Sequence, residues 1–155
     1  MTGDGFAALL GRFADAVAAH DSAGFAALFA DDGVYDDHFF GPHAGRVSIA
    51  AMLDRFHVGG ERFCWQFFEP LAAGDTGYAR YLFSYLSREP ESAGRTIVFE
   101  GMSRFRFAGA LIAHYVEAFD RGIAFAQLGY APARRLKLAD RYTGAFIAED
   151  RVRDH

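Results

Sequence analysis

The chain has 155 residues, of which 52% are hydrophobic and 23% charged, so we expect one packed domain and exclude a disordered chain. Its formal net charge of −4 argues against nucleic acid as a partner, because phosphate binding needs a basic surface. The single cysteine, Cys64, excludes an internal disulfide framework and a zinc site built from several cysteines.

The first third of the chain is predicted to be mostly helical. Apolar residues between positions 6 and 17 recur every three or four positions, which is typical of an amphipathic helix. A second, short helix is expected to begin at Ser22 and to end before Asp31-Asp32-Gly33. After a short strand over 34–37 and a loop over 38–45, a third helix is predicted around 49–56.

Four runs rich in Phe, Tyr and Val follow, and we predict that they form strands. They cover residues 62–69, 78–88, 96–107 and 111–119, and turn-forming residues separate them. The sequence then predicts a short helix behind Asp120 and a polar, peripheral helix after Pro132. We therefore expect one domain over residues 1–140, followed by a peripheral tail over 141–155.

This order of elements predicts an α+β fold with a strongly curved, mostly antiparallel sheet wrapped around the N-terminal helices. Strands of about ten residues make a larger sheet than three short helices can fill. Since aromatic residues make up 16% of the chain, we expect a cavity with an aromatic wall on the concave side. No apolar run is long enough to cross a membrane, and the start of the chain lacks the features of a signal peptide. We expect a cytoplasmic protein without a membrane partner.

Four parts of the chain resemble the SnoaL-like branch of the nuclear-transport-factor-2-like superfamily, which includes the ketosteroid isomerases. They are FADDGVYDD at 29–37, GPHAGRVSI at 41–49, SRFRFAGALI at 103–112, and YVEAFD at 115–120 followed by AQLG at 126–129. The resemblance implies a cone-shaped, cystatin-like fold around a pocket. It also implies a homodimer, which we expect to form through the outer face of the sheet. Members of this superfamily have different functions, so the chemistry of this chain has to be inferred from its own residues.

Asp37 is the strongest candidate for a catalytic group. The resemblance places it where ketosteroid isomerases carry their general base. Aromatic neighbours at Tyr35, Phe39 and Phe40 would desolvate this carboxylate partly and raise its pKa. The alternative is that Asp37 is a solvated residue in the turn that ends the strand.

Two better-known activities of the superfamily fit this chain poorly. The positions where ketosteroid isomerases carry their oxyanion-hole Tyr and Asp hold Phe13 and Ser103, and Ser103 offers only a weak hydrogen bond. Glu117 matches an acid of the epoxide hydrolases, but Arg80 lacks the Asp that should follow two residues later. Glu117 is still a candidate pocket acid, or else the partner of an arginine in an ion pair.

The cyclases of the SnoaL-like branch suggest two further residues, His114 and Asp120. Alternation places both on the strand face opposite Glu117, so both sets cannot line one pocket without a bulge. We consider a helix cap the better role for Asp120. His38 and His43 frame the loop over the expected cavity mouth, and their spacing with Asp37 fits no standard metal motif.

These observations predict a SnoaL-like protein with an apolar pocket for a hydrophobic small molecule. Its chemistry would be a cofactor-free isomerisation or cyclisation of a polyketide, terpenoid or other hydrophobic carbonyl compound, without a metal. The alternative is a non-catalytic ligand-binding or dimerisation module. We expect catalytic roles for Asp37, His38 and Glu117. The expected ligand contacts are Tyr35, Phe40, His43, Phe56, Trp65, Tyr85, Ser103 and His114.

Overall fold

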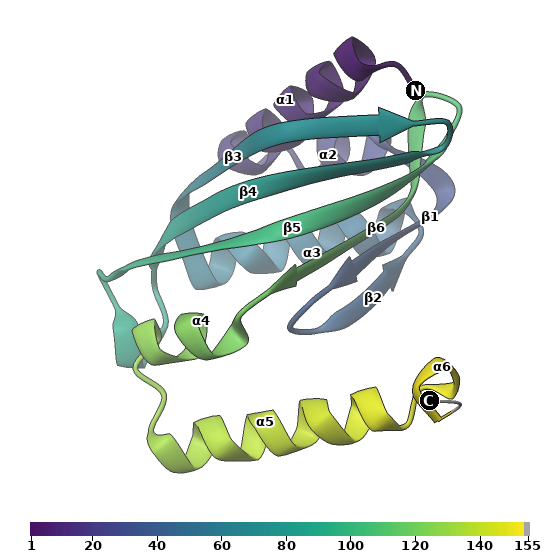
Figure 1. Cartoon of the computed structure of the whole chain (residues 1–155). Coiled ribbons are helices and arrows are strands. Elements are labelled where there is room, and N and C mark those ends of the chain that lie inside the picture. Colours follow the sequence, from purple (N-terminus) through teal and green to yellow (C-terminus); the bar gives the residue numbers. More distant parts are fainter. Residues whose placement is uncertain (154–155) are drawn as a thin grey trace.

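The computed structural model describes residues 1–153, which form six α-helices and one six-stranded sheet (Figure 1). The helices are α1 (Gly3–Ala19), α2 (Ser22–Ala27), α3 (Arg46–Gly59), α4 (Arg121–Gln127), α5 (Pro132–Ile147) and α6 (Asp150–Arg153), with a 3₁₀ turn at Pro90–Ser92. The strands are β1 (Phe29–Asp37), β2 (Gly41–Ala44), β3 (Gly60–Ala73), β4 (Thr76–Ser87), β5 (Thr96–Ala108) and β6 (Leu111–Phe119).

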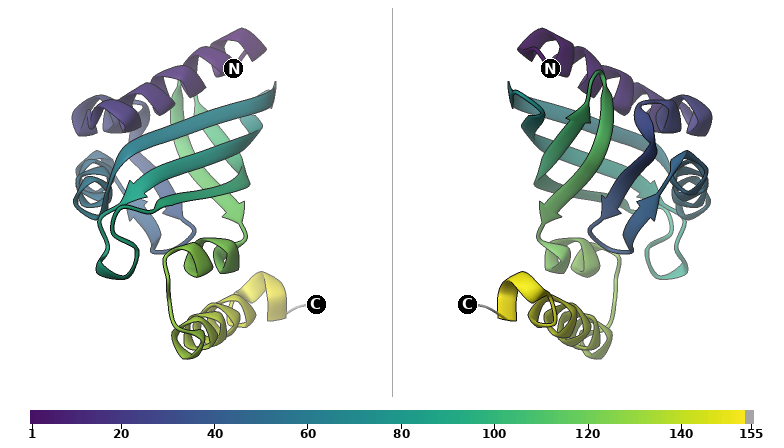
Figure 2. Two further views of the ribbon diagram at one scale, coloured as in Figure 1. Left: turned by 90° about the vertical axis from the view of Figure 1, so that its left-hand side faces the viewer. Right: turned by 90° about the vertical axis from the view of Figure 1, so that its right-hand side faces the viewer.

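The sheet has the order β2-β1-β6-β5-β4-β3. Only the β1–β6 pair is parallel, and the other four neighbouring pairs are antiparallel. The predicted α+β fold with a curved, mostly antiparallel sheet is therefore confirmed. Helices α1, α2 and α3 lie along one face of the sheet, whereas α4 and α5 lie beyond one of its ends (Figures 1 and 2).

The core fills the concave side of the sheet under α1. Phe13, which is fully buried, contacts aromatic rings from α2 and from the four strands β1, β3, β5 and β6. Phe6, on the same face of α1, packs edge-on against Phe105 and Phe107 of β5. The predicted helical period of α1 is correct, because its buried residues are Phe6, Leu9, Leu10, Phe13 and Val17. This packing occupies only one part of the sheet and leaves the end near α4 and α5 for a cavity.

Two local predictions need correction. The predicted loop over 38–45 contains strand β2, which pairs with the end of β1. Residues Asp31 and Asp32 do not end a helix but lie inside β1, where the pairing with β6 shifts register. Gly33 lies within this shift and allows the two strands to approach closely, because a Cβ atom there would lie 2.9 Å from the carbonyl oxygen of Ile112 in the neighbouring strand.

The outer face of the sheet carries exposed apolar side chains. These side chains belong to Phe68, Tyr78, Leu82, Val98 and Met102, on β3, β4 and β5. This is the face through which we expect a second copy to pack, and the dimer stays a prediction. Within residues 1–153, none of the helices has the length and apolar character needed to span a bilayer.

Candidate functional site

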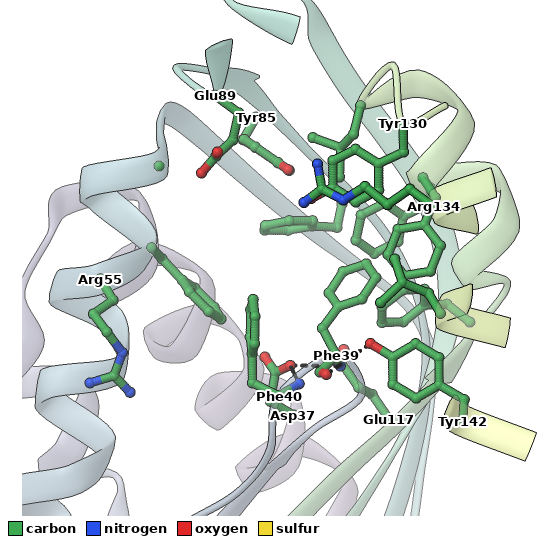
Figure 3. A pocket seen from close by; sticks show the side chains of 18 of the residues that line it. Asp37, Phe39, Phe40, Arg55, Tyr85, Glu89, Glu117, Tyr130, Arg134 and Tyr142 are labelled. Carbon is green, nitrogen blue, oxygen red and sulfur yellow. Dashed lines mark hydrogen bonds between the residues drawn. The ribbon is translucent and has the colours of Figure 1, made fainter. Parts of the chain in front are cut away.

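A cavity of about 340 Å³ opens at the end of the sheet near α4 and α5 (Figure 3). Its volume lies within the range of small-molecule binding sites. Aromatic side chains dominate its wall, as the sequence predicts, and they come from strands and helices alike. They belong to Phe39, Phe40, Phe56, Phe63, Phe83, Tyr85, Phe99, Phe119, Phe125, Tyr130 and Tyr142.

Helix α5 covers one side of this cavity, although we expected a peripheral tail from residue 141. The helix continues through residue 140 without a break, and Arg141 and Tyr142 both line the cavity. The hydroxyl of Tyr142 donates a hydrogen bond to the carbonyl oxygen of Phe39 at 3.0 Å. The guanidinium of Arg121 lies 3.9 Å from the centre of the Tyr142 ring. The C-terminal helix is therefore part of the site.

Asp37 is the last residue of β1, and its side chain is only 4% exposed. Its Oδ1 atom accepts hydrogen bonds from the backbone amides of Phe39 at 2.7 Å and Phe40 at 2.8 Å (Figure 3). These bonds turn the chain from β1 towards β2. Burial nevertheless raises the pKa of Asp37 above its ordinary value, against the effect of the two amides. Asp37 is thus a turn residue, as the alternative drawn from the sequence held, but it is buried rather than solvated, and its carboxyl group lines the cavity.

Glu117 lines the same cavity from β6. Its Oε2 atom accepts hydrogen bonds from the hydroxyls of Tyr81 at 2.9 Å and Tyr115 at 3.0 Å. Burial, with a further contribution from the nearby charge of Asp37, raises the pKa of Glu117 to about 8, although the two phenols oppose this shift. Glu117 is therefore mostly protonated at neutral pH.

The phenols that hold Glu117 belong to a buried hydrogen-bond network. The hydroxyl groups of Ser103 and Tyr115 lie 2.9 Å apart, and the strand register places Ser103 directly opposite Glu117. Gly101 makes room for the phenol of Tyr81, since a Cβ atom there would lie 2.6 Å from its oxygen. The sequence analysis missed Tyr81 and Tyr115. Alternation along β6 was the available signal for Tyr115, which lies two residues before Glu117 on the same face.

The two carboxyl groups are suited to different tasks. With a pKa of about 8, Glu117 keeps its proton at neutral pH, and the charge of Asp37 is one cause of that value. The two backbone amides stabilise the ionised form of Asp37. A carboxyl group whose anion is held by two backbone amides can accept a proton, and a neutral carboxylic acid in the same cavity can donate one.

Of the other predicted residues, four lie at the cavity or beside it. Phe40, Phe56 and Tyr85 line it, and Phe40 is 75% exposed at the mouth. His38 lies behind the wall, with its ring 4.8 Å from that of Phe119, and its backbone carbonyl accepts a hydrogen bond from Arg121 at 2.7 Å. Burial lowers the pKa of His38 to about 4, so this imidazole is neutral.

The remaining predicted contacts lie outside the cavity lining. Tyr35 stacks on Tyr115 in the core, and Ser103 belongs to the network described above. Trp65 packs against Tyr81 and Phe83. His43 lies on β2, near Arg55 of α3. His114 is half-buried on the face of β6 opposite Glu117.

Asp120, which the sequence analysis preferred as a cap, accepts a hydrogen bond from the amide of Gly122 at 2.7 Å at the start of α4. In the part of the chain that the structure describes, no three His, Cys, Asp or Glu side chains come together as ligands for a metal ion would.

Comparison with known proteins gives a family and a fold. A sequence model of the SnoaL-like domain matches residues 10–115, which is more than half of the chain. A protein with a ketosteroid isomerase-like fold from Catenulispora acidiphila, solved with trimethylamine, is 21% identical, with a TM-score of 0.72 over 79% of this chain and 93% of that one. For an epoxide hydrolase of M. tuberculosis described as LEH-like, the identity is 19% and the TM-score 0.64, over 77% and 86% of the chains. A candidate SnoaL-like polyketide cyclase from Shewanella putrefaciens is 16% identical, with a TM-score of 0.66 over 77% and 93% of the chains. Comparison with curated proteins found no match.

Proposed function

Because the chain belongs to the SnoaL-like domain family, we propose that its cavity binds a hydrophobic carbonyl compound and catalyses a cofactor-free proton transfer on it. Identities near 20% show a common fold and leave the reaction open, so the support must come from the site itself. The observation that carries the proposal is the pair of buried carboxyl groups, Asp37 and Glu117, in one aromatic cavity.

In the proposed reaction, Asp37 is the general base. Its Oδ1 atom is engaged by two backbone amides, so we assign Oδ2 to take a proton from the carbon next to the substrate carbonyl. Glu117 gives its proton to the carbonyl oxygen as the C–H electron pair moves into the new C=C bond. The product of this step is the enol, with Asp37 neutral and Glu117 ionised. In an isomerisation, Asp37 gives its proton to a different carbon of a conjugated enol, and the enol oxygen returns its proton to Glu117. In a cyclisation, the enol carbon attacks a second carbonyl group, whose oxygen takes the proton of Asp37, and the enol oxygen returns its proton to Glu117.

The protein contributes mainly through desolvation and orientation. Most of the cavity wall is aromatic, and a substrate packed against these rings would displace water, which strengthens the interaction between the reacting groups and the developing charge on oxygen. Tyr81 and Tyr115 fix the Glu117 carboxyl group and stabilise the anion that it becomes after proton transfer.

This arrangement differs from that of the ketosteroid isomerases at a specific position. The resemblance places their neutral Asp where this chain has Ser103, whose hydroxyl is engaged with Tyr115. Glu117 lies directly across the β5–β6 pair from Ser103 and supplies a neutral acid from the neighbouring strand instead. Phe13, at the position of their Tyr, lies in the core.

The test is deuterium exchange at the carbon next to a ketone. 2-Tetralone, a bicyclic aromatic ketone, is incubated with the protein in D₂O at pD 7, and loss of its α-proton signals is followed by ¹H NMR. We expect the protein to accelerate exchange over buffer. Asp37→Asn should lower the catalysed rate by about 100-fold or more, and Glu117→Gln by about 10-fold or more.

Asp36→Asn is the matched control for the charge of Asp37. It removes the neighbouring carboxylate of the same strand, which does not line the cavity, and should leave the exchange rate within about twofold. Unchanged turnover in Asp37→Asn would remove Asp37 as the base.

A second candidate function is ligand binding without turnover. The observation that favours it is that both phenols near the carboxyl groups donate to Glu117, so neither of them is free to stabilise a substrate oxyanion as the oxyanion-hole Tyr of the ketosteroid isomerases does. Binding of 2-tetralone, seen as a thermal shift, without any accelerated exchange would support this function. Asp37→Asn would then bind the ketone as well as the wild type does.

A further inference from the structure

The charged side chains of the cavity are divided between its two ends. Asp37 and Glu117 are buried at the inner end. The charged side chains at the mouth are exposed and belong to α3, α5 and the segment after β4: Arg55, Arg134, Arg141 and Glu89. The mouth therefore carries three cationic groups against one anionic group, in a protein whose overall charge is negative.

Two of these arginines have no carboxylate partner within residues 1–153. Arg134 is paired with Glu91 at 3.0 Å and lies over the ring of Tyr130. Arg55 forms no such pair, and its polar neighbour is His43 Nδ1 at 3.5 Å. Arg141 lies 5.2 Å from the centre of the Tyr142 ring and likewise pairs with no carboxylate.

The arginines of the cavity lining lie on two different helices around the opening. Arg55 projects from α3, and Arg134 lies across the opening on the α5 side (Figure 3). Arg141 lies two helical turns after Arg134 on the same helix. A group that enters between α3 and α5 therefore passes between two helices that each carry arginines of the cavity lining.

We propose that the cavity takes an amphiphilic anion, with an aromatic or alicyclic body between the rings and a carboxylate held at the mouth by Arg55 and Arg141. The carboxylate stays at the mouth because burial at the inner end would remove it from water, beside two carboxyl groups and away from the arginines. Planar guanidinium groups suit a carboxylate because they can donate two parallel hydrogen bonds. The assignment of the carbonyl end to the carboxyl pair rests on the proposed function.

The anion site is tested by binding alone, with two ligands of the same shape. 2-Naphthylacetate and 2-naphthylacetamide differ in charge at one end, and their dissociation constants are measured by isothermal titration calorimetry in 50 mM salt. We expect the wild type to bind the anion at least about fivefold more tightly than the amide. The double variant Arg55→Gln/Arg141→Gln should reduce this ratio to about one and leave the amide affinity within about twofold.

The control variant, Arg135→Gln/Lys137→Gln, removes the same charge from exposed positions of α5 that do not line this cavity. It should keep the preference for the anion. Equal affinities of the wild type for the two ligands would overturn the inference, and so would an equal loss in the control variant. If the wild type shows no preference for the anion, the ketone exchange experiment can still support the proposed function. If the protein does not accelerate ketone exchange, the preference for the anion can still be observed, so the two proposals are tested separately.

Discussion

The inner end and the mouth of the cavity are built differently. At the inner end, Asp37 and Glu117 lie on strands, are almost fully buried, and are held by backbone amides or phenols. At the mouth, the arginines lie on helices and are exposed, and α5 itself has no buried residue. Burial raises the pKa of both carboxyl groups, so the proposed proton chemistry depends on the part of the site where the sheet fixes the backbone. The proposed recognition of an anion needs only exposed guanidinium groups, which helices at the mouth can carry.

The largest contrast concerns stability. Phe13→Ala removes a ring at the centre of the core, and we expect a loss of about 3–5 kcal/mol in the free energy of unfolding. Leu136→Ala, on α5, removes a side chain that is 65% exposed, and the expected loss is below about 0.5 kcal/mol. Urea denaturation of both variants measures the difference, and similar losses would show that α5 is as tightly packed as α1.

The second prediction concerns pH. The pKa of Glu117 rises from an ordinary value of 4.5 to about 8 on folding, so between these values the folded chain binds one proton more than the unfolded chain. The free energy of unfolding must then fall as pH rises through this window, by at most about 1.4 kcal/mol per pH unit.

Urea denaturation at pH 5.5 and pH 7.5 measures this contribution. The wild type should lose about 2 kcal/mol more over this interval than Glu117→Gln, in which the titrating group is absent. Parallel changes in the two proteins would mean that Glu117 is ionised throughout the interval.

The smallest effect on stability is expected from loss of the hydrogen bond that holds α5 against the cavity. Tyr142→Phe removes the hydrogen bond to the Phe39 carbonyl and keeps the ring under Arg121. A typical hydrogen bond contributes about 1 kcal/mol, so amide exchange in α5 should become about fivefold faster while amides of β5 keep their rates. Unchanged exchange in α5 would show that other contacts hold the helix.

The sequence identified the inner end better than the mouth. Asp37 and Glu117 stand out because acids are rare among the apolar residues of strands, and the family pattern marks their positions. Tyr81 and Tyr115 could not be recognised in the same way, because a tyrosine within a run of aromatic residues looks like any core residue. Their role depends on the β4–β5–β6 register, which no local pattern specifies.

The sequence did not predict that α5 lines the mouth of the cavity, because this helix has the composition of a surface helix. Its polar residues and lack of a buried face indicate a peripheral position, and that description of its exposure is accurate. What the sequence does not contain is the long-range contact from Tyr142 to Phe39, which places the helix over the cavity. Strand β2 was missed for a similar reason, since Gly41 and Pro42 are typical of a loop.

The most direct test of the proton chemistry is a ¹³C NMR titration of the Glu117 side-chain carboxyl group, assigned by comparison with Glu117→Gln. If the buried pair works as proposed, this carbon changes its chemical shift with a midpoint near pH 8. A midpoint near 4.5 would mean that Glu117 is a carboxylate at neutral pH, and the site would then have no acid to protonate a substrate oxygen.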